Sequence, residues 1–254
     1  MKDLINKYRK LILLSAGIWA VLLVLFLVNT AFSMSKVNHF VRQIKSKQYE
    51  FESKINWSNA EARELYKEKL WLENQVALAK TNSFSMGIDL KDSLVQVQLK
   101  GTILFQSKIL KQRPPHFFDA PGKETYLNYF SGITAMDYSM SNIPKKPIKK
   151  VTAPSIGSEV EARKPDTLKV DRIRWEFNTQ NQIKVIINGV SFSDDSTKLD
   201  IPVVKDIYSY KIRNGIKNTF SQNYMPVLFL WLNDSEVKAI YRALPDKAEL
   251  IFRN

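Results

Sequence analysis

The chain has 254 residues, of which 44% are hydrophobic and 11% aromatic, enough apolar material for one or two folded domains. Its formal net charge is +13, and strongly basic chains bind nucleic acid, anionic lipid or acidic polymers. It contains no cysteine, which excludes thiol nucleophiles, disulfides and cysteine-based metal sites, and its eight glycines disfavour glycine-rich phosphate loops.

The first element expected is a membrane anchor. Residues 11–28 are an unbroken apolar run without charge, and at about 1.5 Å per residue a helix of this length nearly crosses the hydrocarbon core of a bilayer. We expect a transmembrane helix over residues 11–32 that contacts membrane lipid, after a cytoplasmic tail at residues 1–10. Positive charge is slightly denser before the run than after it, which predicts a single-pass inner-membrane protein with its bulk in the periplasm.

A cleaved signal peptide is the alternative, because Ala31, Phe32 and Ser33 resemble a cleavage site. The apolar run is longer than the 7–15 residues of a usual signal sequence, which favours a retained anchor. Both interpretations export the remainder of the chain. An exported domain rarely meets nucleic acid, so we expect anionic lipid or a cell-wall polymer such as peptidoglycan as the partner of its basic charge.

Residues 33–82 are expected to form an α-helical stalk. Apolar side chains recur there at alternating spacings of four and three, which is the seam of a coiled coil. The seam residues that mark a possible partner stalk are Val37, Val41, Ile44, Phe51, Ile55, Leu65, Leu72 and Val76. The pattern breaks at Asn56 and Trp57, and Ser58 followed by Glu61 has the spacing of a capping box that starts a second helix.

Two interpretations of the stalk remain open. In the first, it dimerises or pairs with another envelope protein. In the second, two amphipathic helices pack on the chain's own domain. Gln48 and Lys69 at seam positions weaken the coiled-coil pattern.

Residues 83–254 predict a mainly β (α+β) globular domain. We expect a three-stranded meander over residues 84–105, whose second strand alternates, with Val95, Val97 and Leu99 on one face and Gln96 and Gln98 on the other. Further strands are expected at residues 170–177 and 182–187, and Asn188 with Gly189 predicts a turn. A helix at 203–220, a strand at 227–232, a helix at 234–244 capped by Asn233 and a strand at 248–253 complete the pattern.

A basic, proline-containing loop is expected at residues 143–165. It includes Lys145, Lys146, Lys149 and Lys150, a possible site for an anionic glycan or lipid. A solvated loop without a ligand is the alternative.

The sequence predicts no catalytic, cofactor-binding or metal-binding residues. HExxH, GxSxG and Walker A signatures are all missing from the sequence. His116 and Asp119, in the loop at residues 113–122, are the only candidates for acid–base catalysis, and they support a cell-envelope enzyme as an alternative function.

Two segments resemble the L,D-transpeptidase (YkuD-like) catalytic domain. FSMGIDLKDSLVQVQLKGTILFQSKI, residues 84–109, is similar to that family's opening meander, and WLNDSEVKAIYRALPDKAELIFR, residues 231–253, is similar to its final capped helix and strand. The family's nucleophile is a cysteine in an S-x-G-C-x-R motif, whereas residues 224–230 contain no cysteine, serine or histidine. The resemblance therefore implies an inactive domain, kept as a scaffold or as a binder of cell-wall peptide or protein.

Together these observations predict a non-enzymatic, membrane-anchored periplasmic subunit with a structural or assembly role in a bacterial cell-envelope complex. A subunit of a pilus or type II secretion platform is a second candidate, because such subunits share the order of anchor, coiled coil and small domain. Platform subunits place helices between the strands of βαββ units, and the meander leaves no room for one.

Overall fold

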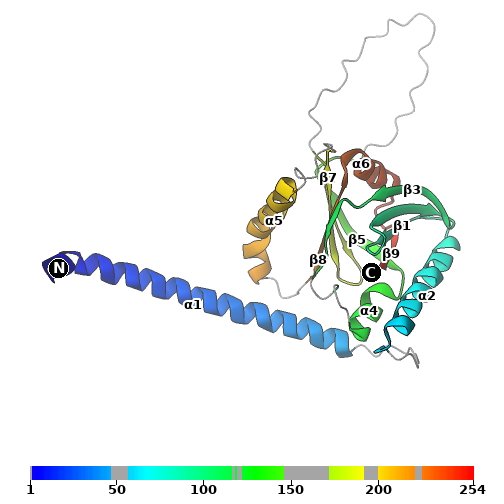
Figure 1. Cartoon of the computed structure of the whole chain (residues 1–254). Coiled ribbons are helices and arrows are strands. Elements are labelled where there is room, and N and C mark those ends of the chain that lie inside the picture. The colour runs from blue at the N-terminus through cyan, green and yellow to red at the C-terminus, as the bar shows by residue number, and fades with distance from the viewer. Residues whose placement is uncertain are drawn as a thin grey trace, which may run out of the picture. The chain divides into compact units, whose positions relative to one another are not determined.

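A computed structural model describes residues 2–46, 57–115, 118, 122–145, 172–191, 200–220 and 225–254 (Figure 1). The chain divides into two compact units, one formed by residues 1–48 with 205–224 and the other by residues 49–204 with 225–254. The helices are α1 (Lys2–Ser46), α2 (Ala60–Ala79), α4 (Lys123–Phe130), α5 (Asp200–Phe220) and α6 (Asp234–Ala243). The strands are β1 (Phe84–Asp89), β2 (Leu94–Leu99), β3 (Thr102–Lys108), β4 (Lys111–Arg113), β5 (Thr134–Ser141), β6 (Arg174–Thr179), β7 (Lys184–Val190), β8 (Val227–Asn233) and β9 (Glu249–Arg253).

α1 is one continuous helix of 45 residues. By length and composition, its segment Leu13–Phe40, with a mean hydropathy of 2.2, could cross a membrane, and none of the apolar window is buried. The helix continues past the apolar run to Ser46, so the expected anchor and the first part of the expected stalk form a single element.

The strands form one mixed sheet in the order β3-β2-β1-β9-β5-β6-β7-β8-β4. The expected meander is confirmed, because β1, β2 and β3 pair antiparallel in sequence order with no helix between them. β9 lies between β1, to which it is parallel, and β5, to which it is antiparallel. The last strand in the sequence therefore occupies the middle of the sheet.

The two outermost strands in the sheet order, β3 and β4, are separated in the chain by only Ile109 and Leu110. Two residues cannot span a flat sheet of nine strands, since neighbouring strands are about 4.8 Å apart. The sheet must therefore curl until its edges approach each other. The Leu110 N–H bonds to the Trp231 carbonyl at 2.8 Å and so leads β4 onto β8.

The interior of this unit is aromatic and aliphatic. Trp175 and Trp231 are each 1% exposed or less, and the Trp175 ring lies 4.9 Å from Phe177 and 5.5 Å from Tyr241 between centroids. α6 begins where β8 ends, with the predicted cap Asn233 accepting a hydrogen bond from the Ser235 N–H at 3.0 Å.

The turn predicted at Asn188 and Gly189 is wrong. Both residues lie inside β7, which pairs parallel with β8. Gly189 is required there for close packing, because an added Cβ would lie 2.8 Å from Ile173 Cγ2 and 2.9 Å from Asp234 Cα. The Asn-Gly pair therefore lies at a closely packed position of a strand. In the chain, α5 connects the two parallel strands β7 and β8.

Candidate interaction surface

α2 is the most informative element of the candidate site, because it has two apolar faces. It begins one residue later than the capping box predicts: the Asn59 side chain, rather than Ser58, accepts a hydrogen bond from the Ala62 N–H at 3.2 Å. Asn is as good an N-cap as Ser, and it satisfies a backbone donor that the helix itself leaves open. Glu61 in the first turn also suits the positive end of the helix dipole.

The inner face of α2 packs on the sheet. Its buried residues are Tyr66, Leu70, Trp71, Asn74 and Leu78. Trp71 and Leu78 share a hydrophobic cluster with Ile251 of β9. Gly87 in β1 makes room for the indole, since a Cβ at this position would lie 3.3 Å from the Trp71 ring. The second interpretation of the stalk, a helix packed on the chain's own domain, therefore describes this face.

Packing of α2 also explains the burial of the glutamines of β2. Gln96 and Gln98 are 9% and 2% exposed. Gln98 Nε2 donates a hydrogen bond to Gln96 Oε1 at 3.1 Å, so part of their polar demand is met within the pair. Both faces of β2 are thus buried, and α2 is an integral layer of this unit.

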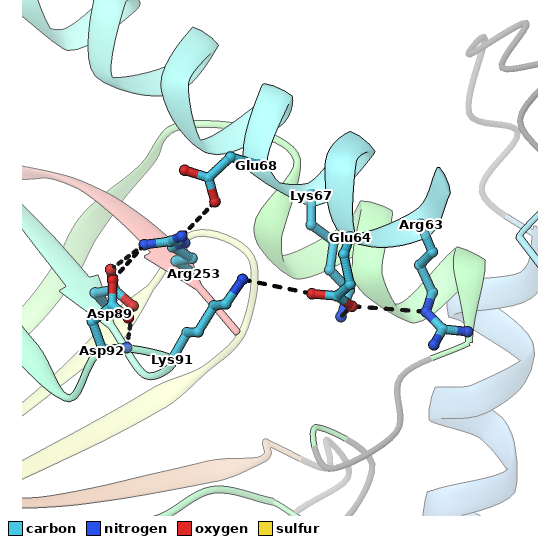
Figure 2. A network of polar contacts seen from close by, with 8 residues as sticks. All are labelled: Arg63, Glu64, Lys67, Glu68, Asp89, Lys91, Asp92 and Arg253. Carbon is cyan, nitrogen blue, oxygen red and sulfur yellow. Dashed lines mark hydrogen bonds and ion pairs between the residues drawn. The ribbon is translucent and has the colours of Figure 1, made fainter. Parts of the chain in front are cut away.

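Charged side chains clamp α2 to the sheet from one side (Figure 2). Arg253 of β9 lies between the carboxylates of Asp89 and Asp92, each 2.8 Å from its Nη1, and it also pairs with Glu68 of α2. The side chains of Arg253 and Asp89 are only 12% and 4% exposed. The guanidinium also lies 5.9 Å from the centroid of the Trp71 ring, within the range of a cation–π contact.

Electrostatics in the clamp favour the charged forms. Burial alone would lower the pKa of Arg253, but the hydrogen bond and charge of Asp89, with the charge of Glu68, raise it. Burial alone would likewise raise the pKa of Glu64, one turn earlier on α2, but it is lowered by Lys67 at 3.0 Å and by Lys91 and Arg63. Opposite charges at these distances stabilise ionised groups, so the clamp persists across neutral pH.

The outer face of α2 carries the seam predicted from the sequence, and it faces solvent. Leu65, Leu72 and Val76 are 66%, 51% and 59% exposed. A shallow hollow of about 630 Å³ follows this face, lined only by α2 side chains: Leu65, Glu68, Lys69, Leu72, Glu73, Val76, Ala77 and Lys80. Because each of the three apolar side chains is half exposed or more, covering it would contribute roughly 1 to 2 kcal/mol. We call the stripe of Leu65, Leu72 and Val76 the outer stripe.

The side chains of the other predicted stalk residues lie outside the described part of the structure. Val37, Val41 and Ile44 lie on α1, but their side chains are outside the described part of the chain, as are Phe51 and Ile55 entirely. Pairing through these positions therefore stays a prediction.

One of the four lysines of the predicted anionic-ligand loop, Lys145, is described. Lys145 Nζ lies 2.7 Å from Asp246 Oδ1 and 5.3 Å from the centroid of the Tyr241 ring, so intramolecular partners already occupy this ammonium group. Lys146, Lys149 and Lys150 are outside the described residues, as are His116 and Asp119. Ligand binding by the loop and catalysis by His116 and Asp119 both stay predictions.

Metal ligands are not grouped in the part of the chain that the structure describes: no three His, Asp or Glu side chains there come together in a way that could hold an ion. The acidic residues of the clamp hold Arg253 instead. Searches against protein-family models, curated proteins and solved structures found no match to this chain. The resemblance to L,D-transpeptidases thus stays a prediction that rests on the two quoted segments.

Proposed function

We propose that this chain is a non-enzymatic structural or assembly subunit of a cell-envelope complex, anchored in a membrane by α1 and bound to another protein chain through α2. The observation that carries the proposal is the outer stripe. It presents apolar side chains to solvent on a helix whose opposite face is buried and clamped.

A helix on a domain surface ordinarily directs polar residues to water, and one that is apolar on two faces is usually covered on both. The outer stripe is fixed in place by the inner face and by Arg253, so a partner would meet a preformed surface. Preformed surfaces lose little conformational entropy on binding, which suits a permanent subunit of an assembly.

The anchor supports the location. A helix with the hydropathy of Leu13–Phe40 is stable in lipid, where its backbone hydrogen bonds are satisfied internally. The predicted orientation, with the N-terminus in the cytoplasm and the globular part in the periplasm, is part of the proposal. We propose that the globular part is catalytically inactive because the sequence contains no recognisable catalytic motif. This proposal does not depend on the resemblance to L,D-transpeptidases.

The proposal is tested on the full chain, extracted from membranes in mild detergent and measured by size-exclusion chromatography with light scattering. We expect a protein mass well above 29.4 kDa for the unaltered chain. Leu72→Glu should reduce that mass, because it places a charge in the middle of the outer stripe. Ala243→Glu is the matched control, since it introduces the same charge at an exposed position in the last turn of another helix, α6. A monodisperse monomer from the unaltered chain would contradict the proposal.

A further inference from the structure

The seam positions on the outer face of α2 are spaced symmetrically along the helix, which allows two copies to pair in opposite directions. The seam positions are Ala62, Leu65, Lys69, Leu72, Val76 and Ala79. Counted from the point between residues 70 and 71, they form three equidistant pairs: 62 with 79, 65 with 76, and 69 with 72. We propose that two copies of this chain pair antiparallel through α2, about a two-fold axis at this point. This inference rests on the proposed function and names the partner of its surface.

The antiparallel arrangement is complementary in size. Leu65 of each copy would lie opposite Val76 of the other, so the two larger apolar contacts form at both ends of the hollow. The aliphatic stem of Lys69 would cover Leu72, as lysine stems commonly do on apolar surfaces.

Charge selects the antiparallel arrangement over the parallel one. Lys69 and Glu73 are 63% and 56% exposed and lie 3.6 Å apart within one helix. In the antiparallel pair, Lys69 of one copy would be almost level with Glu73 of the other, on the same side of the interface, and this contact would occur twice. In a parallel pair in register, Lys69 would instead oppose its own counterpart, and like charges in an interface are unfavourable.

The surface is small, and that explains why the anchor matters. A stable interface in solution usually buries about 800 Å² on each partner, more than a stripe on one 20-residue helix supplies. Confinement to a membrane raises the effective concentration of a second copy, so a weak contact becomes populated. A two-fold axis also closes the assembly at two copies instead of building a fibre.

Disulfide trapping tests the geometry directly, because the chain has no cysteine of its own. Two differently tagged full-length copies are co-expressed, one with Leu65→Cys and the other with Val76→Cys, and membranes are treated with a mild oxidant. Antiparallel pairing brings these two positions together. It keeps each position about 16 Å along the helix axis from its own counterpart, at 1.5 Å per residue, beyond the reach of a disulfide.

We expect the mixed disulfide to form at least five-fold more than either same-site disulfide. It should also exceed by five-fold the product from Leu65→Cys with Lys108→Cys, where Lys108 is an exposed residue of β3 that reports random collision. Lys69→Glu should reduce the mixed product several-fold, and adding Glu73→Lys should restore it. Circular dichroism of each variant checks that the domain is folded.

Two results would overturn the inference: same-site disulfides that equal the mixed one, or a mixed product no greater than the collision control. If either occurs while Leu72→Glu still dissolves a larger assembly, the partner is a different protein and the proposed function stands. If Leu72→Glu changes neither the disulfide nor the mass of the assembly, both proposals fail.

Discussion

Replacing Arg253 with methionine tests the clamp that positions α2. Methionine keeps apolar contact with Trp71 but removes the charge, and Asp89 is left with a carboxylate that is only 4% exposed and lacks its cation. Breaking a buried ion pair by removal of one partner typically costs 3–5 kcal/mol. The other two partners, Glu68 and Asp92, are 40% and 55% exposed and add below about 1 kcal/mol each.

We therefore expect Arg253→Met to lower the free energy of unfolding by about 3 kcal/mol, the lower end of that range because water reaches one side of the clamp. For a chain of this size, that corresponds to a fall in Tm of roughly 6 to 12 °C. The measurement is thermal and urea unfolding of the detergent-solubilised chain, followed by circular dichroism. Lys91→Met is the matched control, because Lys91 pairs with Glu64 at 3.7 Å with both side chains 46% exposed; its cost should stay below about 1 kcal/mol.

The double variant Arg253→Met, Asp89→Asn separates the charge from the packing. Asparagine keeps the side-chain oxygen that accepts the Asp92 N–H at 2.9 Å, but it carries no charge to be left unpaired. Stability should therefore recover by about 1 to 2 kcal/mol relative to Arg253→Met alone. The reasoning is refuted if Arg253→Met lowers the free energy of unfolding no more than Lys91→Met does. It is also refuted if the losses caused by Arg253→Met and Asp89→Asn add in the double variant.

Three further predictions concern groups away from the clamp. Burial alone would raise the pKa of Glu176, but Lys184 at 2.9 Å and Arg174 at 2.8 Å lower it. The stability that the ionised Glu176 supplies is therefore present above its ordinary pKa near 4.5 and is lost as the pH falls. Glu176→Gln should be less stable at pH 7, and its free energy of unfolding in urea should change less between pH 5 and 3. Burial raises the pKa of Tyr126 above its ordinary value of 10.0, so its contribution to stability is complete below pH 10 and is lost as the pH rises. Tyr126→Phe should reduce the loss of stability at alkaline pH. An unchanged loss would mean that other groups cause it. Gly189→Ala should lower the free energy of unfolding by about 1 to 3 kcal/mol, because the added Cβ would meet Ile173 and Asp234. Gly132→Ala is the control: open space surrounds its Cα, so stability should change by below about 0.5 kcal/mol. Equal Tm values for the two variants would contradict the packing argument.

Local periodicity predicted those elements whose signal lies within one segment. The alternation in β2 and the apolar run in β8 both correspond to the structure, and the two residues that connect β2 to β3, Lys100 and Gly101, have positive φ, at 53° and 77°. Such a turn matches the twist of the two strands it connects, which is why the dipeptide is informative by itself.

The sequence pattern of β2 did not predict that a separate helix, α2, buries its glutamines. Gln96 and Gln98 alternate with valines as if one face of β2 met water, yet α2 supplies Trp71 to that side through the space left by Gly87. Trp71 precedes Gln96 by 25 residues in the chain, and nothing in the strand's own alternation specifies that its polar face will be covered.

The candidate surface was predicted in part. The spacing of Leu65, Leu72 and Val76 identified the outer stripe, whereas the inner face was hidden because its side chains recur at a similar helical period. Arg253 was missed because its partner Asp89 is 164 residues away in the chain. A single arginine at the end of a strand has no local signature of a clamp.

The central position of β9 makes the order of synthesis matter. Until residues 249–253 emerge, β1 has an unpaired edge, Arg253 cannot reach Asp89, and α2 lacks both its cluster with Ile251 and its clamp. The chain cannot complete its sheet while it is still being synthesised, and it reaches its final form only after β9 has been added. A firmly held α2 is therefore present only in chains that already contain β9, and shorter chains would present the outer stripe on a helix that is not fixed to the sheet.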